Sequence, residues 1–432
     1  MAGYKAIKDW IYGLQVFGIK LGLNSTESLL KRLGDPHKDF ASIHLAGTNG
    51  KGSTASVMAA ALIEAGYKVG LYTSPHLVSF RERFLINGRM PRPERLAGSM
   101  ARVRAVVDES EPPTFFEFVT ALAFLYFKEQ GVEVAVIETG MGGRLDATNV
   151  LQPLVSLISD IGVEHTQYLG RTLKEIAGEK AGIIKPGVPV VTQARRPTAV
   201  GVIAQRAEEL KAPLYRLGRD FKARWGKGGL SYRGLDWSLK GLRPGLPGRH
   251  QGRNAALALA GLEVLNRRGL AVDEQAACDG LEKVNWPGRF QAIGQRPLTI
   301  LDGAHNPAAC RVLAEALKEV PRRRLILVLG AMADKDLSGM LKALGGLLDL
   351  SAGGDELILT RAAYERSATP EALAEAAQRL GYRFTIVGEL LAAIGRAREM
   401  AGQEDLIVIT GSLFIAGETL AGLGLTPIFK ED

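Results

Sequence analysis

The stretch SIHLAGTNGKGSTASV, residues 42–57, predicts a strand, a glycine-rich turn and a helix in direct succession. At such a turn, successive glycines let backbone N–H groups point inward around phosphate oxygens, and the helix dipole favours the same anion. Lys51 is expected to pair with the outer phosphates of a nucleotide, and the Ser53 hydroxyl to ligate Mg²⁺. The alternative is a turn that binds nothing, because Gly52 separates lysine from serine, unlike the common phosphate-binding loop. The residues expected to contact the nucleotide are Thr48, Asn49, Gly50, Lys51, Gly52 and Ser53.

Apolar, β-branched runs alternate with longer helical segments along the rest of the chain, which is typical of parallel sheets covered by helices. A first series of strands is expected at 42–47, 68–74, 132–139, 153–159 and 188–193. A second series is expected at 298–304, 324–332, 356–360, 383–388 and 405–412. The predicted fold class is α/β, with an N-terminal P-loop domain of mostly parallel sheet and a C-terminal Rossmann-like α/β domain.

Length and composition suggest where the domains divide. A chain of 432 residues is long for one domain. Segment 294–297, rich in Gly, Gln, Arg and Pro, is the expected linker, so the domains are predicted at 1–293 and 298–432. Residues 217–242 are expected to contain a small antiparallel hairpin.

Composition also excludes several classes of protein. The net charge of +8 arises from 54 basic and 46 acidic residues, a modest field that helps to gather anions such as nucleotides. No basic run is interleaved with aromatic residues, so nucleic acid is not an expected partner. The two cysteines form no CxxC pair, which argues against a disulfide framework or a zinc site. No segment resembles a membrane span or the apolar core of a signal peptide, so a cytoplasmic protein without membrane partners is expected.

Polar residues follow the neighbouring strands, where the carboxyl ends of a parallel sheet open on one crevice. Ser74, in TSPHL, offers a hydroxyl, and Glu138 ends an apolar strand where a Mg²⁺-bound triphosphate needs a carboxylate. His165 follows the next strand and is interpreted as another metal ligand. Each residue taken alone has a simpler interpretation. Ser74 would be part of a Ser-Pro turn, Glu138 would end a strand before a glycine-rich loop, and His165 would be a structural histidine.

Seven motifs occur in one order along the chain: GTNGKGS, TSPHL, ETGMGGRLDATN, EHT, EKAG, PGRFQ and LDGAHNP. Together they resemble folylpolyglutamate synthase and the bifunctional dihydrofolate synthase/folylpolyglutamate synthase, which are relatives of the Mur ligases. The resemblance implies an ATP- and Mg²⁺-dependent ligase that joins L-glutamate to a folate or to dihydropteroate. The balanced composition makes a monomer the expected oligomeric state. The carboxylate would attack the γ-phosphate of ATP, and the amine of glutamate would then displace phosphate from the acyl phosphate. The folate site would belong to the first domain and the glutamate ligase activity to the second.

The resemblance also implies roles that spacing cannot assign. Lys180 is by spacing a solvated helix lysine, but it matches a lysine that is carbamylated in the family and so becomes an anionic ligand. His305 is expected where glutamate meets the acyl phosphate, and it joins Lys51 and Lys180 as a catalytic residue. The residues matching magnesium ligands, for two ions, are Ser53, Ser74, Glu138 and His165. Further nucleotide contacts are expected from Asn254, Arg289 and Asp302. The expected substrate-binding residues are Leu21, Gly22, Leu23, Phe116, Gly143, Arg144, Leu145 and Asp146.

Two departures from the family's pattern and two rival functions remain open. The family's DHT motif is EHT here, with Glu164. Lys20 stands where bifunctional members have an acidic residue, so the acceptance of dihydropteroate is an open question.

A Mur ligase acting on another carboxylate usually carries a large domain before the phosphate loop, whereas 46 residues precede Gly47. A P-loop ATPase switch would explain the loop but would leave Asp302 and His305 without a task.

Overall fold

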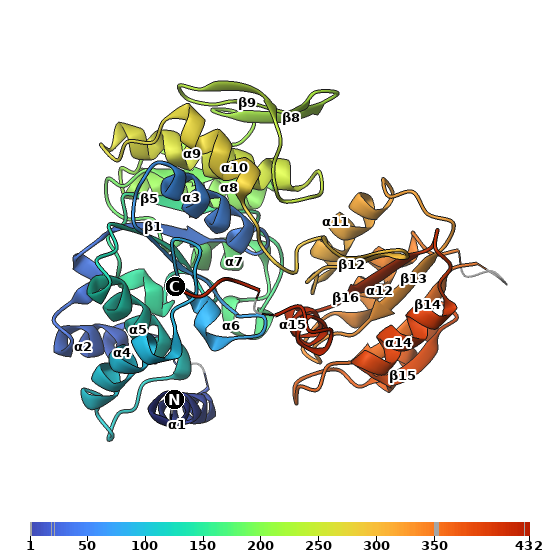
Figure 1. Cartoon of the computed structure of the whole chain (residues 1–432). Helices are drawn as coiled ribbons and strands as arrows, with labels where there is room; N and C mark the ends of the chain where they lie inside the picture. The colour runs from blue at the N-terminus through green and yellow to red at the C-terminus, as the bar shows by residue number, and fades with distance from the viewer. Residues whose placement is uncertain (1, 19, 21, 350–353, 427) are drawn as a thin grey trace.

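The computed structural model describes residues 2–18, 20, 22–349, 354–426 and 428–432, which form two lobes (Figure 1). Each lobe contains a mostly parallel sheet with helices packed on both faces. The predicted α/β class, with two successive parallel-sheet domains, is therefore confirmed.

The first lobe contains a seven-stranded sheet in the order β3-β2-β4-β1-β5-β6-β7, in which β3 is antiparallel to β2 and the other described pairs are parallel. Its strands are β1 (Ala41–Ala46), β2 (Val69–Tyr72), β3 (Phe84–Ile86), β4 (Val134–Glu138), β5 (Val155–Ile158), β6 (Val190–Thr192) and β7 (Leu214–Arg216). Its helices are α1 (Ala2–Gly13), α2 (Asn24–Arg32), α3 (Lys51–Glu64), α4 (Pro93–Ala105), α5 (Phe115–Glu129), α6 (Thr166–Leu169), α7 (Leu173–Ala181), α8 (Pro197–Glu209), α9 (Gln251–Arg267) and α10 (Glu274–Lys283).

The central strand β4 shows how the sequence builds two cores from one sheet. Val134 and Val136 belong to the core that contains residues of α3, α9 and α10. Ala135 and Ile137 belong to the opposite core, which contains residues of α1, α2, α4 and α5. Because successive side chains of a strand point to opposite faces, a continuous apolar run is what a sheet buried on both sides requires.

The predicted hairpin within 217–242 is confirmed and belongs to a three-stranded antiparallel sheet. Its strands are β8 (Lys222–Gly226), β9 (Gly229–Arg233) and β10 (Ser238–Leu242). The buried carboxylate of Glu263 in α9 fixes this sheet, since it accepts hydrogen bonds from the Tyr232 hydroxyl and from the backbone N–H of Asp236 and Trp237.

The second lobe contains a six-stranded sheet in the order β11-β12-β16-β13-β14-β15. Its strands are β11 (Gln291–Gln295), β12 (Leu298–Leu301), β13 (Leu325–Leu329), β14 (Glu356–Arg361), β15 (Thr385–Glu389) and β16 (Leu406–Thr410). Its helices are α11 (Pro307–Leu317), α12 (Leu337–Gly345), α13 (Pro370–Arg379), α14 (Leu390–Met400) and α15 (Leu413–Gly422). Successive side chains of β13 again point to opposite faces of the sheet. Leu325 and Leu327 pack in the core that contains α11, α12 and α13, and Ile326 packs in the core that contains α14 and α15.

The linker predicted at 294–297 is wrong. Strands β11 and β12 pair antiparallel, with Gln295 opposite Leu298, so this segment forms the end and the turn of a hairpin inside the second sheet. Glycine and proline are as common in tight turns as in linkers, and composition alone does not separate the two. The connection between the two sheets lies before Gln291.

The chain also returns to the first lobe at its C-terminal end (Figure 1). Met90 donates its backbone N–H to Lys430 at 2.8 Å, and Asp432 donates its N–H back to Met90 at 3.0 Å. The ring of Phe429 lies 5.6 Å from that of Trp286, which belongs to the first connection between the lobes. The lobes are therefore joined twice, and the two connections touch.

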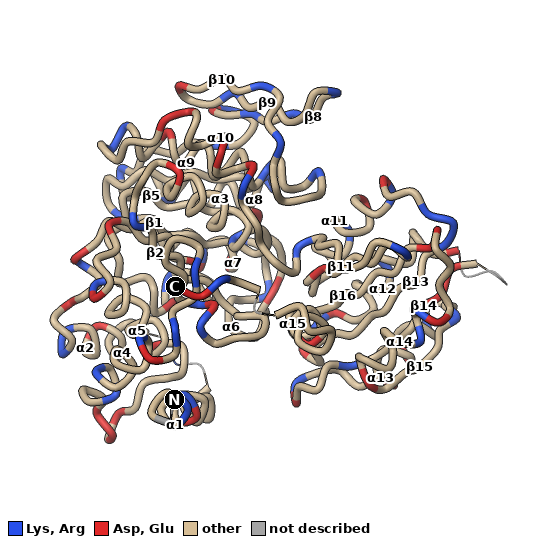
Figure 2. The backbone as a smooth tube through the Cα atoms, in the orientation of Figure 1, with Lys and Arg blue, Asp and Glu red and all other residues tan. Residues whose placement is uncertain are grey.

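Lysine and arginine residues are distributed over both lobes together with the acidic residues (Figure 2). Many exposed cations are paired with nearby acids, as Lys283 is with Glu64 at 2.6 Å. None of the helices in the described part of the chain is long and apolar enough to cross a membrane.

Helix α10 packs so closely on α3, the helix that follows the phosphate loop, that Gly280 has no room for a side chain. A Cβ there would lie 2.3 Å from the backbone N of Ala61. We expect Gly280→Ala to lower the free energy of unfolding by about 1–3 kcal/mol, as overpacking does. Gly201→Ala in α8, where a Cβ would meet nothing within 4 Å, is the control and should be neutral or stabilising. Urea unfolding of both variants measures this, and equal effects would contradict the packing described.

Candidate active site

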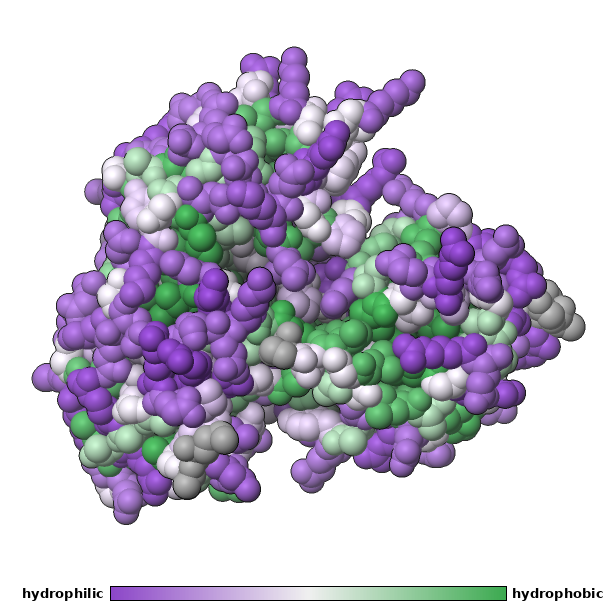
Figure 3. Space-filling view, in the orientation of Figure 1, coloured by the Kyte–Doolittle hydropathy of each residue, from purple (hydrophilic) through white to green (hydrophobic). Residues whose placement is uncertain are grey.

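A cavity between the two lobes gathers the predicted nucleotide and metal residues; the space-filling view shows the hollow between the lobes (Figure 3). Its wall combines the phosphate loop and strand ends of the first lobe with the loops after β12, β13 and β16 of the second. The predicted site residues that line it are Thr48, Asn49, Gly50, Lys51, Gly52, Ser53, Ser74, Glu138, His165, Asn254, Arg289, Asp302 and His305.

Two glycines of the phosphate loop are required by their surroundings. Gly47 has φ of 146°, and a Cβ on it would lie 1.8 Å from Oγ of Ser159. Gly50 has φ of 90°, and its Cβ would lie 2.4 Å from Oδ1 of Asn254. Residues with a side chain rarely adopt such φ values, so the loop conformation depends on glycine at both positions.

Lys51 lies at the start of α3 and joins the loop to the end of β4. Its Nζ donates to the carbonyl oxygen of Gly47 at 3.0 Å and lies 3.9 Å from Oε1 of Glu138. Burial raises the pKa of Glu138, while the charges of Lys51 and Arg289 oppose that rise. The ammonium group is therefore held beside the loop by a carbonyl and a carboxylate, where it can reach an anion in the cavity.

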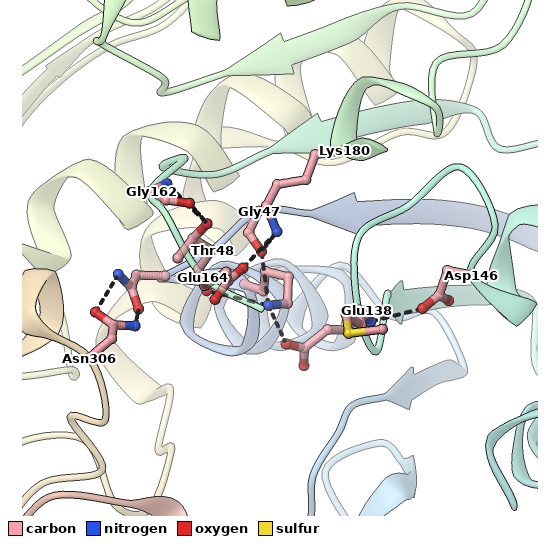
Figure 4. Close-up of polar contacts among 11 residues, drawn as sticks. Gly47, Thr48, Glu138, Asp146, Gly162, Glu164, Lys180 and Asn306 are labelled. Atoms are coloured by element: carbon pink, nitrogen blue, oxygen red, sulfur yellow. Dashed lines mark hydrogen bonds and ion pairs between the residues drawn. The ribbon is translucent and has the colours of Figure 1, made fainter. Parts of the chain in front are cut away.

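Thr48 and Asn49 line the cavity, but their side chains are hydrogen-bonded to other parts of the protein; Figure 4 shows the contacts of Thr48 and Asn306. The Thr48 hydroxyl donates to the carbonyl of Gly162 at 3.1 Å and accepts from its N–H at 3.0 Å. The Asn49 side chain accepts a hydrogen bond from Nδ2 of Asn306 at 3.0 Å. Because Asn306 also caps helix α11, this contact links the phosphate loop directly to the second lobe.

Lys180 lies beneath the loop and does not line the cavity. It is 1% exposed, and its Nζ donates to the Gly47 carbonyl at 2.9 Å and to Oε1 of Glu164 at 2.7 Å (Figure 4). Burial lowers the pKa of Lys180, and the Glu164 carboxylate opposes this shift. Burial would raise the pKa of Glu164, but the charges of Lys180 and Lys51 and the hydrogen bond from Lys180 together outweigh it and hold that pKa at about 2. The prediction from spacing alone, that Lys180 is a solvated lysine on a helix, is therefore wrong.

The donors predicted to hold magnesium face one cavity: the hydroxyls of Ser53 and Ser74, the carboxylate of Glu138 and the imidazole of His165. Burial lowers the pKa of His165, which keeps a lone pair on its ring. No group of three or more His, Cys, Asp and Glu residues that could hold a metal occurs in the described part of the chain. Hydroxyl and carboxylate oxygens suit Mg²⁺, so the residues fit the ion if the phosphates of a nucleotide complete its shell.

The amide side chains of Gln193, Gln251 and Asn254 form a hydrogen-bonded network in the wall of the first cavity, and only Asn254 among them was predicted from the sequence. Gln193 donates to Oδ1 of Asn254 at 2.9 Å, and Asn254 donates to Oε1 of Gln251 at 2.8 Å. Oε1 of Gln193 is buried and has no hydrogen-bond partner among the described residues. No sequence pattern distinguishes these glutamines, because they meet only when β6 and α9 are packed together.

Asp302 and His305 follow β12 in the second lobe. The Asp302 carboxylate accepts the N–H groups of Phe290 and Ala304, each at 2.8 Å. Nδ1 of His305 donates to the carbonyl oxygen of Gly303 at 2.9 Å, which leaves Nε2 as an acceptor. Burial lowers the pKa of His305 to about 4, so the ring is neutral near pH 7.

A second cavity adjoins the first, and both are lined by Ser74, Pro75 and Gly140. Five of the predicted substrate-binding residues line it, namely Gly22, Phe116, Arg144, Leu145 and Asp146. Leu23 and Gly143 do not line it, and Leu21 lies outside the described residues. Gly143 instead allows close packing, because a Cβ on it would lie 2.8 Å from the carbonyl oxygen of Glu179.

The polar residues of this second cavity are largely engaged with the protein itself. Asp146 accepts from the N–H of Met141 at 2.9 Å and from the N–H of Thr148 at 3.0 Å. Arg144 is paired with Glu179, with Nη2 at 2.8 Å from Oε1. Asp146 therefore shapes the glycine-rich loop, and the remaining wall is mainly aromatic and apolar.

A phosphate-loop lobe and a second parallel-sheet lobe that share one cavity are the arrangement of two-domain, nucleotide-dependent ligases. Family models agree: residues 45–262 match the Mur ligase middle domain, and residues 288–413 match the glutamate ligase domain of Mur ligases. The chain belongs to the Mur ligase family, in its folylpolyglutamate synthase/dihydrofolate synthase branch. The family predicted from the sequence, and the class of enzyme with it, are confirmed.

Individual relatives support this placement. The chain is 41% identical over 355 residues to the dihydrofolate synthase/folylpolyglutamate synthase of Bacillus subtilis, which covers 79% of this chain and 82% of the relative. Escherichia coli FolC, solved with DHPP and ADP, is 32% identical with a TM-score of 0.88 and coverage of 97% and 98%. The bifunctional enzyme of Yersinia pestis, solved with AMPPNP and a Mn ion, is 33% identical with a TM-score of 0.87 and the same coverage.

Proposed function

We propose that this chain uses ATP to join L-glutamate to the carboxylate of a folate through an acyl phosphate. The observation that supports this most directly is the meeting of two cavities at Ser74, Pro75 and Gly140. A long substrate with an aromatic head in the apolar cavity would present its carboxylate at the phosphate loop. A carboxylate is a poor electrophile, so it must be activated before an amine can attack it.

In the first step, a carboxylate oxygen attacks the γ-phosphorus of ATP, and ADP leaves. The loop 47–53 would hold the phosphates through its backbone N–H groups, and Lys51 would offset the charge that otherwise repels the incoming carboxylate. Asn254, Arg289 and Asp302 line the same cavity and are proposed to contact the rest of the nucleotide.

Magnesium would be held by Ser53, Ser74, Glu138 and His165, which all line the cavity of the phosphate loop. The bound ion would neutralise phosphate charge and so lower the barrier to phosphoryl transfer. The protein's own part is to keep these donors beside Lys51. The backbone of His165 has φ of 47°, an uncommon value for a residue with a side chain and one often found at functional sites.

Lys180 is proposed to be carbamylated in the active enzyme. The nucleophile that adds CO₂ is the neutral amine, and the burial that lowers the pKa of Lys180 favours that form. As the nitrogen–carbon bond forms, the amine would lose one proton, and the Glu164 carboxylate, 2.7 Å from Nζ, is placed to take it up. The product would be an anionic carbamate beneath the loop, which is proposed as a further metal ligand.

In the second step, the amine of glutamate attacks the acyl carbon, and phosphate leaves with one oxygen of the original carboxylate. His305 is proposed to accept a hydrogen bond from this amine through Nε2, because Nδ1 is already used by the Gly303 carbonyl. Its residence in the second lobe fits the matching glutamate ligase domain.

Both folates and dihydropteroate are proposed as acceptors, with Lys20 at the wall of the second cavity. Gly22, Phe116, Arg144, Leu145 and Asp146 are the proposed walls of the same site. A monomer would suffice, since one chain supplies both sides of the cavity. The two cysteines, Cys278 and Cys310, are unpaired, as suits a cytoplasmic enzyme.

The proposal predicts that phosphate release from ATP requires both glutamate and a pteroyl acceptor. A coupled phosphate assay with tetrahydrofolate or dihydropteroate measures this. Lys51→Ala should lower the rate by about 10²-fold or more while the protein remains folded, because charge neutralisation at the transferring phosphate is lost. Phosphate release that ignores glutamate and every pteroyl compound would instead favour a P-loop ATPase switch.

Carbamylation predicts chemical rescue. Lys180→Ala should lower turnover by about 10²-fold, and a short carboxylic acid such as acetate should restore part of it by occupying the space of the carbamate. Lys174→Ala, an exposed lysine in the same helix, is the control and should keep normal activity. Full activity of Lys180→Ala without added acid would contradict a role for the carbamate.

A further inference from the structure

Arg83 is a buried cation without a matching anion. It ends the short helix η3 (Phe80–Arg83) and is 6% exposed. It forms no ion pair with any described residue, and yet it lines the second cavity beside Ser74 and Phe116. The removal of an unpaired charge from water is strongly unfavourable, so the retention of Arg83 at this position indicates a ligand that brings the opposite charge.

Neutral groups hold the Arg83 guanidinium in place. Its Nε donates to Nδ1 of His76 at 2.9 Å, and Nε2 of His76 lies 3.4 Å from the hydroxyl of Tyr12. The guanidinium also lies over the ring of Phe115, 5.4 Å from its centre. Burial, and then the charge of Arg83 itself, lower the pKa of His76 to about 3, so His76 is a neutral acceptor. These contacts orient Arg83 without cancelling its charge.

The nearby carboxylates are already bound elsewhere. Glu82 accepts the backbone N–H groups of Leu77 at 2.7 Å and of Val78 at 3.0 Å. Asp146 is held by its own loop, and Glu179 is paired with Arg144. Within the described part of the chain, Nη1 and Nη2 of Arg83 make no hydrogen bond. They form a fork that matches a carboxylate.

The position of Arg83 relates it to one part of the substrate. Arg83 donates to His76, which directly follows Ser74 and Pro75, two residues that line both cavities. Arg83 therefore lies on the side of the second cavity that faces the phosphate loop, where the end of the substrate that carries its carboxylates must lie. A folate ends in a glutamyl group with two carboxylates, one that is activated and one that is not. Dihydropteroate has a single carboxylate, and it is the one that reacts.

We propose that Arg83 binds the non-reacting α-carboxylate of the terminal glutamyl group of a folate, with His76 and Tyr12 as its positioning residues. The assignment rests on the proposed function and adds a specificity-determining residue to it. Arg83 would support the extension of a glutamyl chain and would contribute little when dihydropteroate is the acceptor.

Equilibrium binding tests the assignment without turnover. The ligands are pteroylglutamate and pteroyl-4-aminobutyrate, which keeps the γ-carboxylate and lacks the α-carboxylate. The wild-type protein should bind pteroylglutamate about 10- to 100-fold more tightly, the value expected for charge-assisted hydrogen bonds. Arg83→Gln should bind the two alike. Arg81→Gln is the matched control, because Arg81 lies in the same short helix but is paired with Glu431 and does not line this cavity.

Steady-state kinetics supply the second readout. Arg83→Gln should raise KM for tetrahydrofolate by the same factor and change KM for dihydropteroate by less than about threefold. An equal rise in KM for both acceptors would overturn the assignment, since Arg83 would then bind the reacting carboxylate or stabilise the fold.

The comparison of the two ligands on the wild-type protein can overturn the assignment even if Arg83→Gln does not fold. Equal affinity of the wild-type protein for the two pteroyl ligands would overturn the role of Arg83 alone. A wild-type protein that bound neither ligand and consumed no ATP with tetrahydrofolate would overturn the proposed function as well.

Discussion

The carbonyl oxygen of Gly47 accepts hydrogen bonds from two lysines, and the rest of the site depends on that point. Lys51 reaches it from the start of α3, and Lys180 reaches it from α7. Neither contact would form if Gly47 carried a side chain, because Ser159 fills the space where a Cβ would lie. One backbone oxygen thus places the cation of the phosphate loop above it and the buried lysine beneath it.

The second lobe is tied to this loop by three features. Asn306 contacts Asn49 of the loop, and the ring of Trp286, in the first connection, packs against Gly52. The C-terminal tail packs on Trp286 through Phe429. The residues proposed to bind glutamate and those proposed to bind ATP are therefore joined by direct contacts at the phosphate loop.

The parts of the fold and of the site that the sequence predicts are those determined by residues close together along the chain. Apolar strands followed by glycine-rich turns located the phosphate loop and the acid Glu138, since both features lie within a few residues. The linker prediction failed because Gly and Pro serve hairpin turns equally well. Lys180 was assigned through family resemblance alone, since its burial results from the packing of α7 against residues of β1, β5 and β6. Arg83 was missed because RERF resembles a charged surface turn, and its burial depends on α1 and α5.

The central claim is that the substrate carboxylate takes up the γ-phosphoryl group of ATP before glutamate attacks. Transfer of ¹⁸O from a labelled carboxylate tests it directly. With tetrahydrofolate carrying ¹⁸O in its γ-carboxylate, one labelled oxygen should appear in each phosphate released, because the carbon–oxygen bond breaks when the amine displaces phosphate. Phosphate that contains no ¹⁸O while the amide product forms would contradict an acyl phosphate intermediate and the mechanism built on it.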